Sequence, residues 1–212
     1  MQIIKVTSVS KSFRGREILS AATASFDKGS ITALVGANGS GKSLLFRMIC
    51  GFVTPDSGEI WVDPIYLSKG RDYPEKFGIS IDRPGFIAHL TGFANLEMLA
   101  NIRRTIGESE ITQIMLDFGL DPKLKQKVRH YSLGMKQKLA LAQAFMESPE
   151  VLILDEPFNG LDEESVETVR NRILAFNQNG GTVIFTSHNS EDVRQLASKV
   201  YAIRNGTLEF LP

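Results

Sequence analysis

Two patterns of apolar residues divide the chain near residue 30. Residues 3–7 and 18–26 are strand-like and are separated by a polar turn at 13–16, which predicts antiparallel β-structure near the N-terminus. The later strands are short continuous apolar runs, a pattern typical of strands that are buried on both faces of a sheet. These runs fall at 31–35, 78–81, 151–154 and 181–188, with a further short strand at 60–62.

Helical spacing of apolar residues appears between these strands and predicts an α/β fold. The longest helical pattern covers 91–128, so we expect an all-helical insertion at about 86–130 inside a single domain of residues 1–212. Other helices are expected at 43–50, from 132 onward, at 163–177 and at 191–198, followed by a terminal hairpin around Asn205-Gly206. The predicted architecture is a mainly parallel core sheet with an N-terminal antiparallel β subdomain and an inserted helical subdomain.

Composition limits the kind of protein this is. Lys and Arg total 24, as do Asp and Glu, whereas nucleic-acid binders usually have a basic excess, so no nucleic-acid partner is expected. The single cysteine, Cys50, forms no disulfide within the chain, fits a reducing compartment, and is expected to be buried. No apolar run approaches the roughly 20 residues that span a bilayer, and the N-terminus lacks a signal-peptide layout. We therefore expect a cytoplasmic protein whose membrane role comes through a partner.

The residues between the strand at 31–35 and the helix at 43–50 follow the phosphate-loop pattern G-x-x-x-x-G-K-S: Gly36, Ala37, Asn38, Gly39, Ser40, Gly41, Lys42 and Ser43. Glycines let successive N–H groups point inward around an anion, and the helix N-terminus adds positive charge. Lys42 reaches the β- and γ-phosphates, and the Ser43 hydroxyl ligates Mg²⁺. The loop, extended to Leu44, predicts a nucleotide site.

Acidic residues end two of the predicted strands. Asp155 and Glu156 follow the strand at 151–154. Asp155 suits Mg²⁺ ligation, directly or through water, and Glu156 suits activation of a water that attacks a γ-phosphate. Asp82 follows the strand at 78–81, where ligands bind in an α/β sheet, although an Asp before Pro-Gly also commonly starts a turn.

Three further positions are candidates for the site. Phe13 lies in a polar turn ahead of the phosphate loop and is equally compatible with stacking on an adenine base and with a core contact. Ser132, with Gly134 close behind it, is a candidate N-cap for a helix, which creates a second helix N-terminus with free N–H groups. His188 ends a strand of the sheet, where a phosphate contact and a structural role are about equally compatible with the sequence.

Taken in order, these motifs resemble those of the ATP-binding-cassette ATPases over essentially the whole chain. Residues 36–43 match the Walker A loop, 151–156 match Walker B with the catalytic glutamate, 159–162 match the D-loop, and His188 matches the switch histidine. Phe13 falls where the family's adenine-stacking aromatic lies. The resemblance implies a P-loop NTPase fold and an ATPase that uses ATP and Mg²⁺.

Two departures from the family pattern indicate which branch of the family the chain resembles. The signature is usually L-S-G-G-Q, and here it is Tyr131-Ser132-Leu133-Gly134-Met135. Ser132 and Gly134 are kept, and the family places them at the γ-phosphate of a partner's site. Asp82 aligns with the Q-loop glutamine, which makes it an expected metal ligand through a water. This combination looks most like the drug, bacitracin and lantibiotic exporter branch.

The resemblance also implies partners. Two cassettes pack head to tail, so this chain is expected to form a homodimer or heterodimer. Its helical insertion and the segment around Asp82 are expected to grip an integral-membrane permease, which would place the chain on the inner face of the cell membrane. Two alternatives remain open at this point. A non-transport ABC ATPase of translation or DNA repair usually has tandem cassettes or coiled-coil insertions, and a regulatory module without turnover should lack Glu156.

Overall fold

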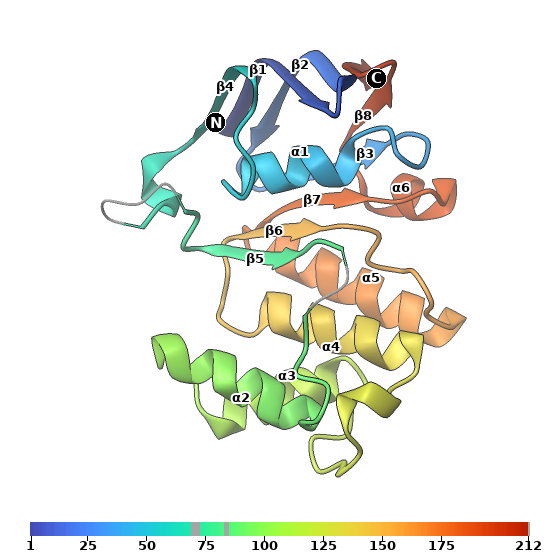
Figure 1. The fold of residues 1–212 in the computed structure, drawn as a ribbon. Coiled ribbons are helices and arrows are strands. Elements are labelled where there is room, and N and C mark those ends of the chain that lie inside the picture. Colours follow the sequence, from blue (N-terminus) through green and yellow to red (C-terminus); the bar gives the residue numbers. More distant parts are fainter. Residues whose placement is uncertain (69–72, 83–84, 212) are drawn as a thin grey trace.

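The computed structural model describes residues 1–68, 73–82 and 85–211, and it contains two sheets with helices between and below them (Figure 1). The smaller sheet is antiparallel, with β1 (Gln2–Phe13) between β2 (Arg16–Asp27) and β4 (Ser57–Val62). Arg14 and Gly15 make the turn from β1 to β2 with φ values of 51° and 78°. The predicted antiparallel region near the N-terminus is confirmed.

The larger sheet has six strands in the order β5 (Phe77–Ser80), β6 (Val151–Leu154), β7 (Thr182–Thr186), β3 (Ile31–Val35), β8 (Lys199–Arg204) and β9 (Thr207–Leu211). Neighbouring strands are parallel except β8 and β9, which form the predicted terminal hairpin. Because five strands run the same way, their carboxyl ends gather along one edge, where α/β sheets bind ligands.

The core sheet is buried on both faces, and β6 shows how the sequence achieves this. Val151 and Ile153 belong to an apolar cluster shared with the antiparallel sheet and α1 (Lys42–Ile49). Leu152 and Leu154, which alternate with them, belong to a second cluster shared with the helices on the opposite face. All four side chains are completely buried. This two-sided packing explains why the strand is a continuous apolar run.

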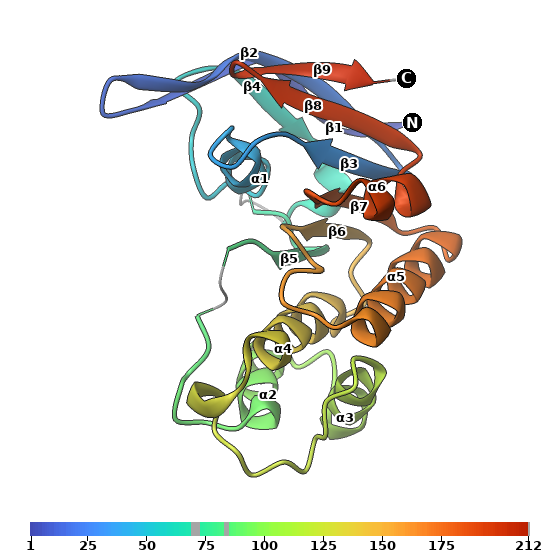
Figure 2. The same ribbon diagram turned by 90° about the vertical axis from the view of Figure 1, so that its right-hand side faces the viewer.

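The helices on the opposite face form two tiers (Figure 2). α4 (Leu133–Phe145) and α5 (Glu163–Gln178) lie next to the core sheet, and α6 (Ser190–Leu196) contacts α5. α2 (Gly92–Arg103) and α3 (Glu108–Asp117) lie farther away, contact each other, and fall between β5 and β6 in the chain. Two 3-10 turns, η1 (Pro64–Tyr66) and η2 (Val128–His130), complete the described elements. Within the described ranges, no helix has both the length and the apolar character needed to cross a membrane.

The prediction of helix throughout 91–128 was wrong for residues 118–127 and for the break between α2 and α3. α2 ends where Arg104 takes a φ of 56°, and after α3 the chain turns at Gly119, with a φ of 67°, and forms no helix until η2. Phe118 and Leu120 are nevertheless buried in the core. The apolar residues that suggested more helix therefore fill the core from irregular chain. The chain between β4 and β5 contains η1, and its residues 69–72 lie outside the described part.

Candidate functional site

The loop between β3 and α1 has the backbone that a phosphate-binding motif needs. Gly36, Gly39 and Gly41 have φ values of 153°, 77° and 105°, which would strain residues with a Cβ. Gly41 is the N-cap of α1 and supplies no side-chain acceptor to its first N–H groups, which suits them to an anion. Lys42 is 7% exposed, and its Nζ donates to the carbonyl oxygens of Gly36 at 2.8 Å and Ala37 at 3.2 Å. Its amine is therefore held over the loop.

A cavity of about 330 Å³ opens beside this loop. It brings together candidate residues from β1, the loop, α1 and the end of β6: Phe13, Asn38, Gly39, Gly41, Lys42, Ser43, Leu44, Asp155 and Glu156. Gly36, Ala37 and Ser40 belong to the same loop without lining the cavity. Residues that are more than a hundred positions apart in the chain thus converge on one concave site.

Asp155 lies at the centre of a chain of short hydrogen bonds. Ser43 Oγ donates to Asp155 Oδ2 at 2.5 Å, and Thr186 Oγ1 donates to Asp155 Oδ1 at 2.6 Å. Thr186 ends β7, the strand next to β6, so the sheet itself sets this contact. The structure therefore places the two predicted metal ligands Ser43 and Asp155 against each other. Sequence reasoning missed Thr186, whose only signal was a polar residue at a strand's carboxyl end.

Glu156 and His188 meet at the same edge of the sheet. His188 Nδ1 lies 2.9 Å from Glu156 Oε2, and the side chains are 65% and 20% exposed respectively. A buried network supports the turn that carries His188. Ser187 Oγ donates to Asp192 Oδ2 at 3.1 Å, and Arg170 donates to Asp192 Oδ1 through Nη2 at 2.5 Å. The hydrogen bond to Asp192 raises the pKa of Arg170, and this ion pair holds α5 and α6 together below the turn.

Phe13 lies at the mouth of the cavity. Its side chain is 49% exposed and lines the cavity together with the loop. Lys11 Nζ lies 5.6 Å from the centroid of its ring, a distance at which a cation is attracted to an aromatic face. Between the two interpretations of this residue, the geometry favours a ring that is available for stacking.

Asp82 has a partner that the sequence did not suggest. Arg47, on α1, donates to Asp82 Oδ2 through Nε at 2.9 Å and Nη2 at 2.5 Å. Asp82 has a φ of 57° and does not line the cavity beside the phosphate loop, whereas Arg47 does. The next two residues, 83 and 84, lie outside the described part. Metal ligation by Asp82 stays a prediction, in competition with this ion pair.

Comparison with known proteins decides the family. A family model described as "ABC transporter" matches residues 19–159. The chain belongs to the ABC transporter family. It is 34% identical over 207 residues to an uncharacterized ABC transporter ATP-binding protein, YybJ, of Bacillus subtilis, covering 98% of this chain and 95% of that protein.

Other ABC relatives have named cargo classes. The chain is 32% identical to the bacitracin transport ATP-binding protein BcrA of Enterococcus faecalis, covering 97% of this chain and 68% of the relative. It is also 32% identical to the lantibiotic transport ATP-binding protein SrtF of Streptococcus pyogenes, covering 97% and 89%. The chain is therefore an ABC transporter ATP-binding protein, and nothing in these comparisons points to the translation or DNA-repair alternative.

Solved structures support the same fold. An ATP-binding subunit of an ABC transporter is 27% identical and has a TM-score of 0.85, covering 97% of this chain and 88% of that one. A dimeric ATP-binding cassette in a post-hydrolysis state, bound to ADP and Pi, has a TM-score of 0.86 at 20% identity, covering 98% and 97%. The predicted α/β P-loop fold is confirmed.

The predicted signature residues, Ser132 and Gly134, lie at the start of α4. Ser132 is the N-cap of α4 and accepts the N–H of Met135 at 3.1 Å. A Cβ on Gly134 would lie 2.8 Å from the carbonyl oxygen of Gly160, so the D-loop leaves room only for glycine there. Neither Ser132 nor Gly134 lines the nucleotide cavity. Leu133, one of the positions where this chain departs from the ABC pattern, is 59% exposed and faces outward.

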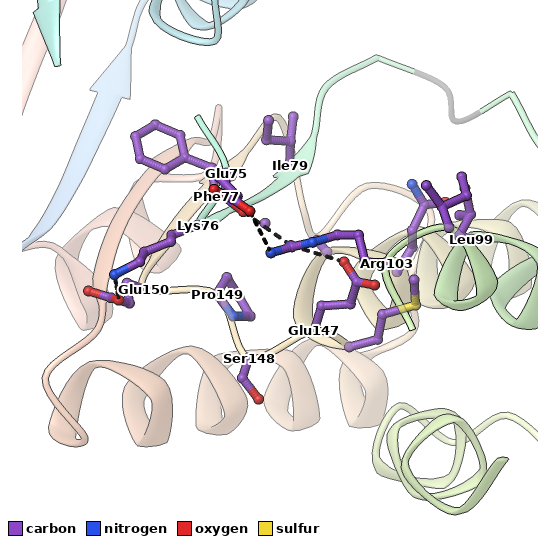
Figure 3. A pocket seen from close by; sticks show the side chains of 15 residues that line it. Glu75, Lys76, Phe77, Ile79, Leu99, Arg103, Glu147, Ser148, Pro149 and Glu150 are labelled. Carbon is purple, nitrogen blue, oxygen red and sulfur yellow. Dashed lines mark hydrogen bonds and ion pairs between the residues drawn. The ribbon is translucent and has the colours of Figure 1, made fainter. Parts of the chain in front are cut away.

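A second cleft of about 470 Å³ lies at the opposite, amino ends of β5 and β6 (Figure 3). In it, Arg103 of α2 donates to the carbonyl oxygen of Glu75 at 3.1 Å and to Glu147 at 3.2 Å. Lys76 pairs with Glu150 at 2.6 Å. Both basic side chains are thus neutralised by protein carboxylates, and none of the predicted ABC site residues lines this cleft.

Proposed function

We propose that this chain is the ATP-hydrolysing subunit of a membrane exporter and that Mg²⁺ is its cofactor. The observation that carries the proposal is the convergence, on one cavity, of the phosphate loop, the Ser43–Asp155 contact and Glu156, with His188 bonded to Glu156. These are the parts that phosphoryl transfer to water requires: a phosphate cradle, a metal site and a general base.

The residues at the loop fit a nucleotide with its metal ion. The loop N–H groups and Lys42 would hold the phosphates, and the exposed ring of Phe13 would stack on the adenine. Ser43 and Asp155 offer two oxygen ligands, and the described residues contain no cluster of three or more His, Cys, Asp or Glu that would hold a metal by themselves. That sparse oxygen set suits Mg²⁺, which keeps several waters and takes the rest of its ligands from phosphates. Bound there, Mg²⁺ would neutralise phosphate charge.

Glu156 performs the proton transfer in this proposal. Its carboxylate accepts a proton from the water that attacks the γ-phosphate. The His188 imidazole, bonded to that carboxylate through Nδ1, would orient it. A regulatory module that binds ATP without hydrolysing it would not need the Glu156–His188 pair beside its phosphate site.

The proposed assembly is a dimer bound to a permease. Residues 1–212 would act as one cassette with a helical insertion at about 86–130. The N-terminus of α4, with Ser132 and Gly134, would close the nucleotide site of a second cassette, in a homodimer or a heterodimer. The helical insertion and the segment around Asp82 would contact an integral-membrane permease, which would hold the chain at the inner face of the cell membrane. The bacitracin and lantibiotic relatives support an exporter.

Replacing the general base tests the enzymatic part. Glu156→Gln should keep ATP binding, lower turnover about 10²–10⁴-fold as loss of a positioned base does, and trap an ATP-bound dimer that is visible by light scattering. Glu59→Gln, on the edge strand β4, is the matched control and should hydrolyse ATP like the parent. Parental turnover in Glu156→Gln would disprove the assignment.

Membrane fractionation tests the transport part. Co-expressed with a candidate integral-membrane permease, the chain should sediment with membranes and leave them in detergent as a complex with that permease. Expressed alone, it should stay in the supernatant. Association with ribosomes or DNA, without any membrane partner, would contradict the exporter proposal and leave the ATPase proposal standing.

A further inference from the structure

Glu156 has a backbone conformation that its neighbours must hold in place. Its φ is 48°, in the left-handed region that costs free energy for any residue with a Cβ and persists only where surrounding contacts enforce it. The N–H of Glu156 is held by Thr186 Oγ1 at 2.8 Å. The next residue, Pro157, has no N–H to contribute. The carbonyl oxygens of Glu156 and Pro157 are further points at which the turn can be held.

One side chain from α4 bonds to both of these carbonyl oxygens. Gln137 Nε2 donates to Pro157 O at 3.1 Å and to Glu156 O at 3.3 Å. The Glu156 carbonyl also accepts the N–H of Asn159 at 3.2 Å, which is a bond within the same turn. Within the described residues, Gln137 is thus the side chain that ties this turn to a helix.

Gln137 is suited to such a role by its chemistry and its location. Its amide nitrogen carries two hydrogens, one for each carbonyl oxygen. α4 lies against the core sheet below β5 and β6 (Figure 2), so the amide projects from a rigid element. Gln137 thus holds the backbone of Glu156. The carboxylate of the same residue contacts His188, with Oε2 2.9 Å from Nδ1.

We infer that Gln137 is a positioning residue that clamps the Glu156–Pro157 turn and so aims the Glu156 carboxylate at the attacking water. The inference rests on the proposed role of Glu156 as the general base. Gln137 does not line the nucleotide cavity, so its loss acts on turnover and leaves ATP binding unchanged.

Gln137→Met removes both donors at similar volume and tests the inference in the full chain. The kcat should fall about 10–100-fold, a part of what a positioned base contributes, while the ATP concentration for half-maximal rate stays within about twofold. Gln143→Met is the matched control on the same helix. Gln143 lines the cleft of Figure 3 and makes no side-chain hydrogen bond among the described residues, so kcat should be parental.

Two further measurements separate positioning from a merely structural role. In a Glu156→Gln background, Gln137→Met should change the residual rate less than about twofold, because both substitutions remove the same function. The chain has three histidines, and in Gln137→Met the imidazole NMR signals of His188 should move while those of His89 and His130 stay. The NMR experiment needs no nucleotide, so it tests Gln137 even if the chain has no ATPase activity.

Parental kcat in Gln137→Met, additive effects in the double variant, or unmoved His188 signals would each overturn the inference. If circular dichroism shows that Gln137→Met is unfolded, the same measurements are made on Gln137→Asn. The shorter amide cannot reach both carbonyl oxygens from the same helix position, so the same loss of kcat and the same shift of His188 are expected.

Discussion

At the amino ends of β5 and β6, acidic side chains meet basic ones, whereas at the carboxyl end of β6 they meet hydroxyls and an imidazole. In the first region Glu150 pairs with Lys76 and Glu147 pairs with Arg103. In the second, Asp155 accepts hydrogen bonds from Ser43 and Thr186. No lysine or arginine in residues 1–68, 73–82 and 85–211 forms an ion pair with Asp155.

The pairing of the carboxylates distinguishes the nucleotide site from the amino-end cleft better than the volumes of the two cavities do. The amino-end cleft has about 470 Å³ and the nucleotide cavity about 330 Å³, so volume alone would favour the wrong one. In the larger cleft the hydrogen bond that Lys76 donates to Glu150 raises the pKa of Lys76, and each charge satisfies the other. Within the part of the chain that the structure describes, the negative charge of Asp155 has no such partner, which leaves it available to a divalent cation.

Asp155→Asn should have the largest effect, because it removes that charge at almost constant shape. ATPase activity should fall at least about 100-fold, beyond the 10–100-fold typical for groups that only support a metal ligand. The chain should remain folded. Glu150→Gln, at the amino end of the same strand, is the matched control and should retain activity. A steady-state ATPase assay at saturating Mg²⁺ measures the activity of both variants. Equal losses of activity would contradict the distinction between the carboxyl and amino ends of β6.

Thr186→Val should have the next largest effect. Thr186 Oγ1 contacts both Asp155 Oδ1 and the N–H of Glu156, so its loss should lower activity about 10–100-fold, as loss of a supporting hydrogen bond to a metal ligand does. Thr182→Val, at the start of the same strand, removes only a hydrogen bond to the N–H of Gly29. It should lower the free energy of unfolding by about 1–3 kcal/mol and leave turnover intact. Similar activity in the two variants would contradict the role given to Thr186.

Sequence reasoning succeeded where a feature is continuous along the chain. The phosphate loop is eight adjacent residues, and β6 is four adjacent apolar residues before two carboxylates, so both were predicted with their neighbours. It failed where one polar side chain matters only because another element packs beside it. Thr186, Gln137 and Arg47 look ordinary in the sequence, and sheet order and helix packing create their contacts.

Asp82 is an intermediate case, since it lies at a carboxyl end and yet has an arginine partner. A metal ion would compete with Arg47 for its carboxylate, and a half-exposed pair of this kind contributes about 0.2–1 kcal/mol. Asp82→Ala should therefore raise the Mg²⁺ concentration for half-maximal ATPase modestly, about 2–5-fold, and Asp82→Gln should recover part of that change. If Asp82 only shapes its turn, Asp82→Asn will titrate like the parent. If the Mg²⁺ titrations of both Asp82→Asn and Asp82→Ala match that of the parent, Asp82 is not a metal ligand.

The smallest effect is expected at the amino end, from Arg103→Gln. Arg103 joins α2 to both Glu75 and Glu147, and its own side chain and that of Glu75 are substantially exposed. Its loss should lower the free energy of unfolding by about 0.5–1 kcal/mol, measured by urea denaturation. ATPase activity should stay within about twofold of the parent. Because exposed ion pairs are screened by salt, the stability difference should shrink in 1 M NaCl. A large loss of activity at unchanged stability would show instead that the amino-end ion pairs act on the nucleotide site, and the contrast between the two strand ends would no longer hold.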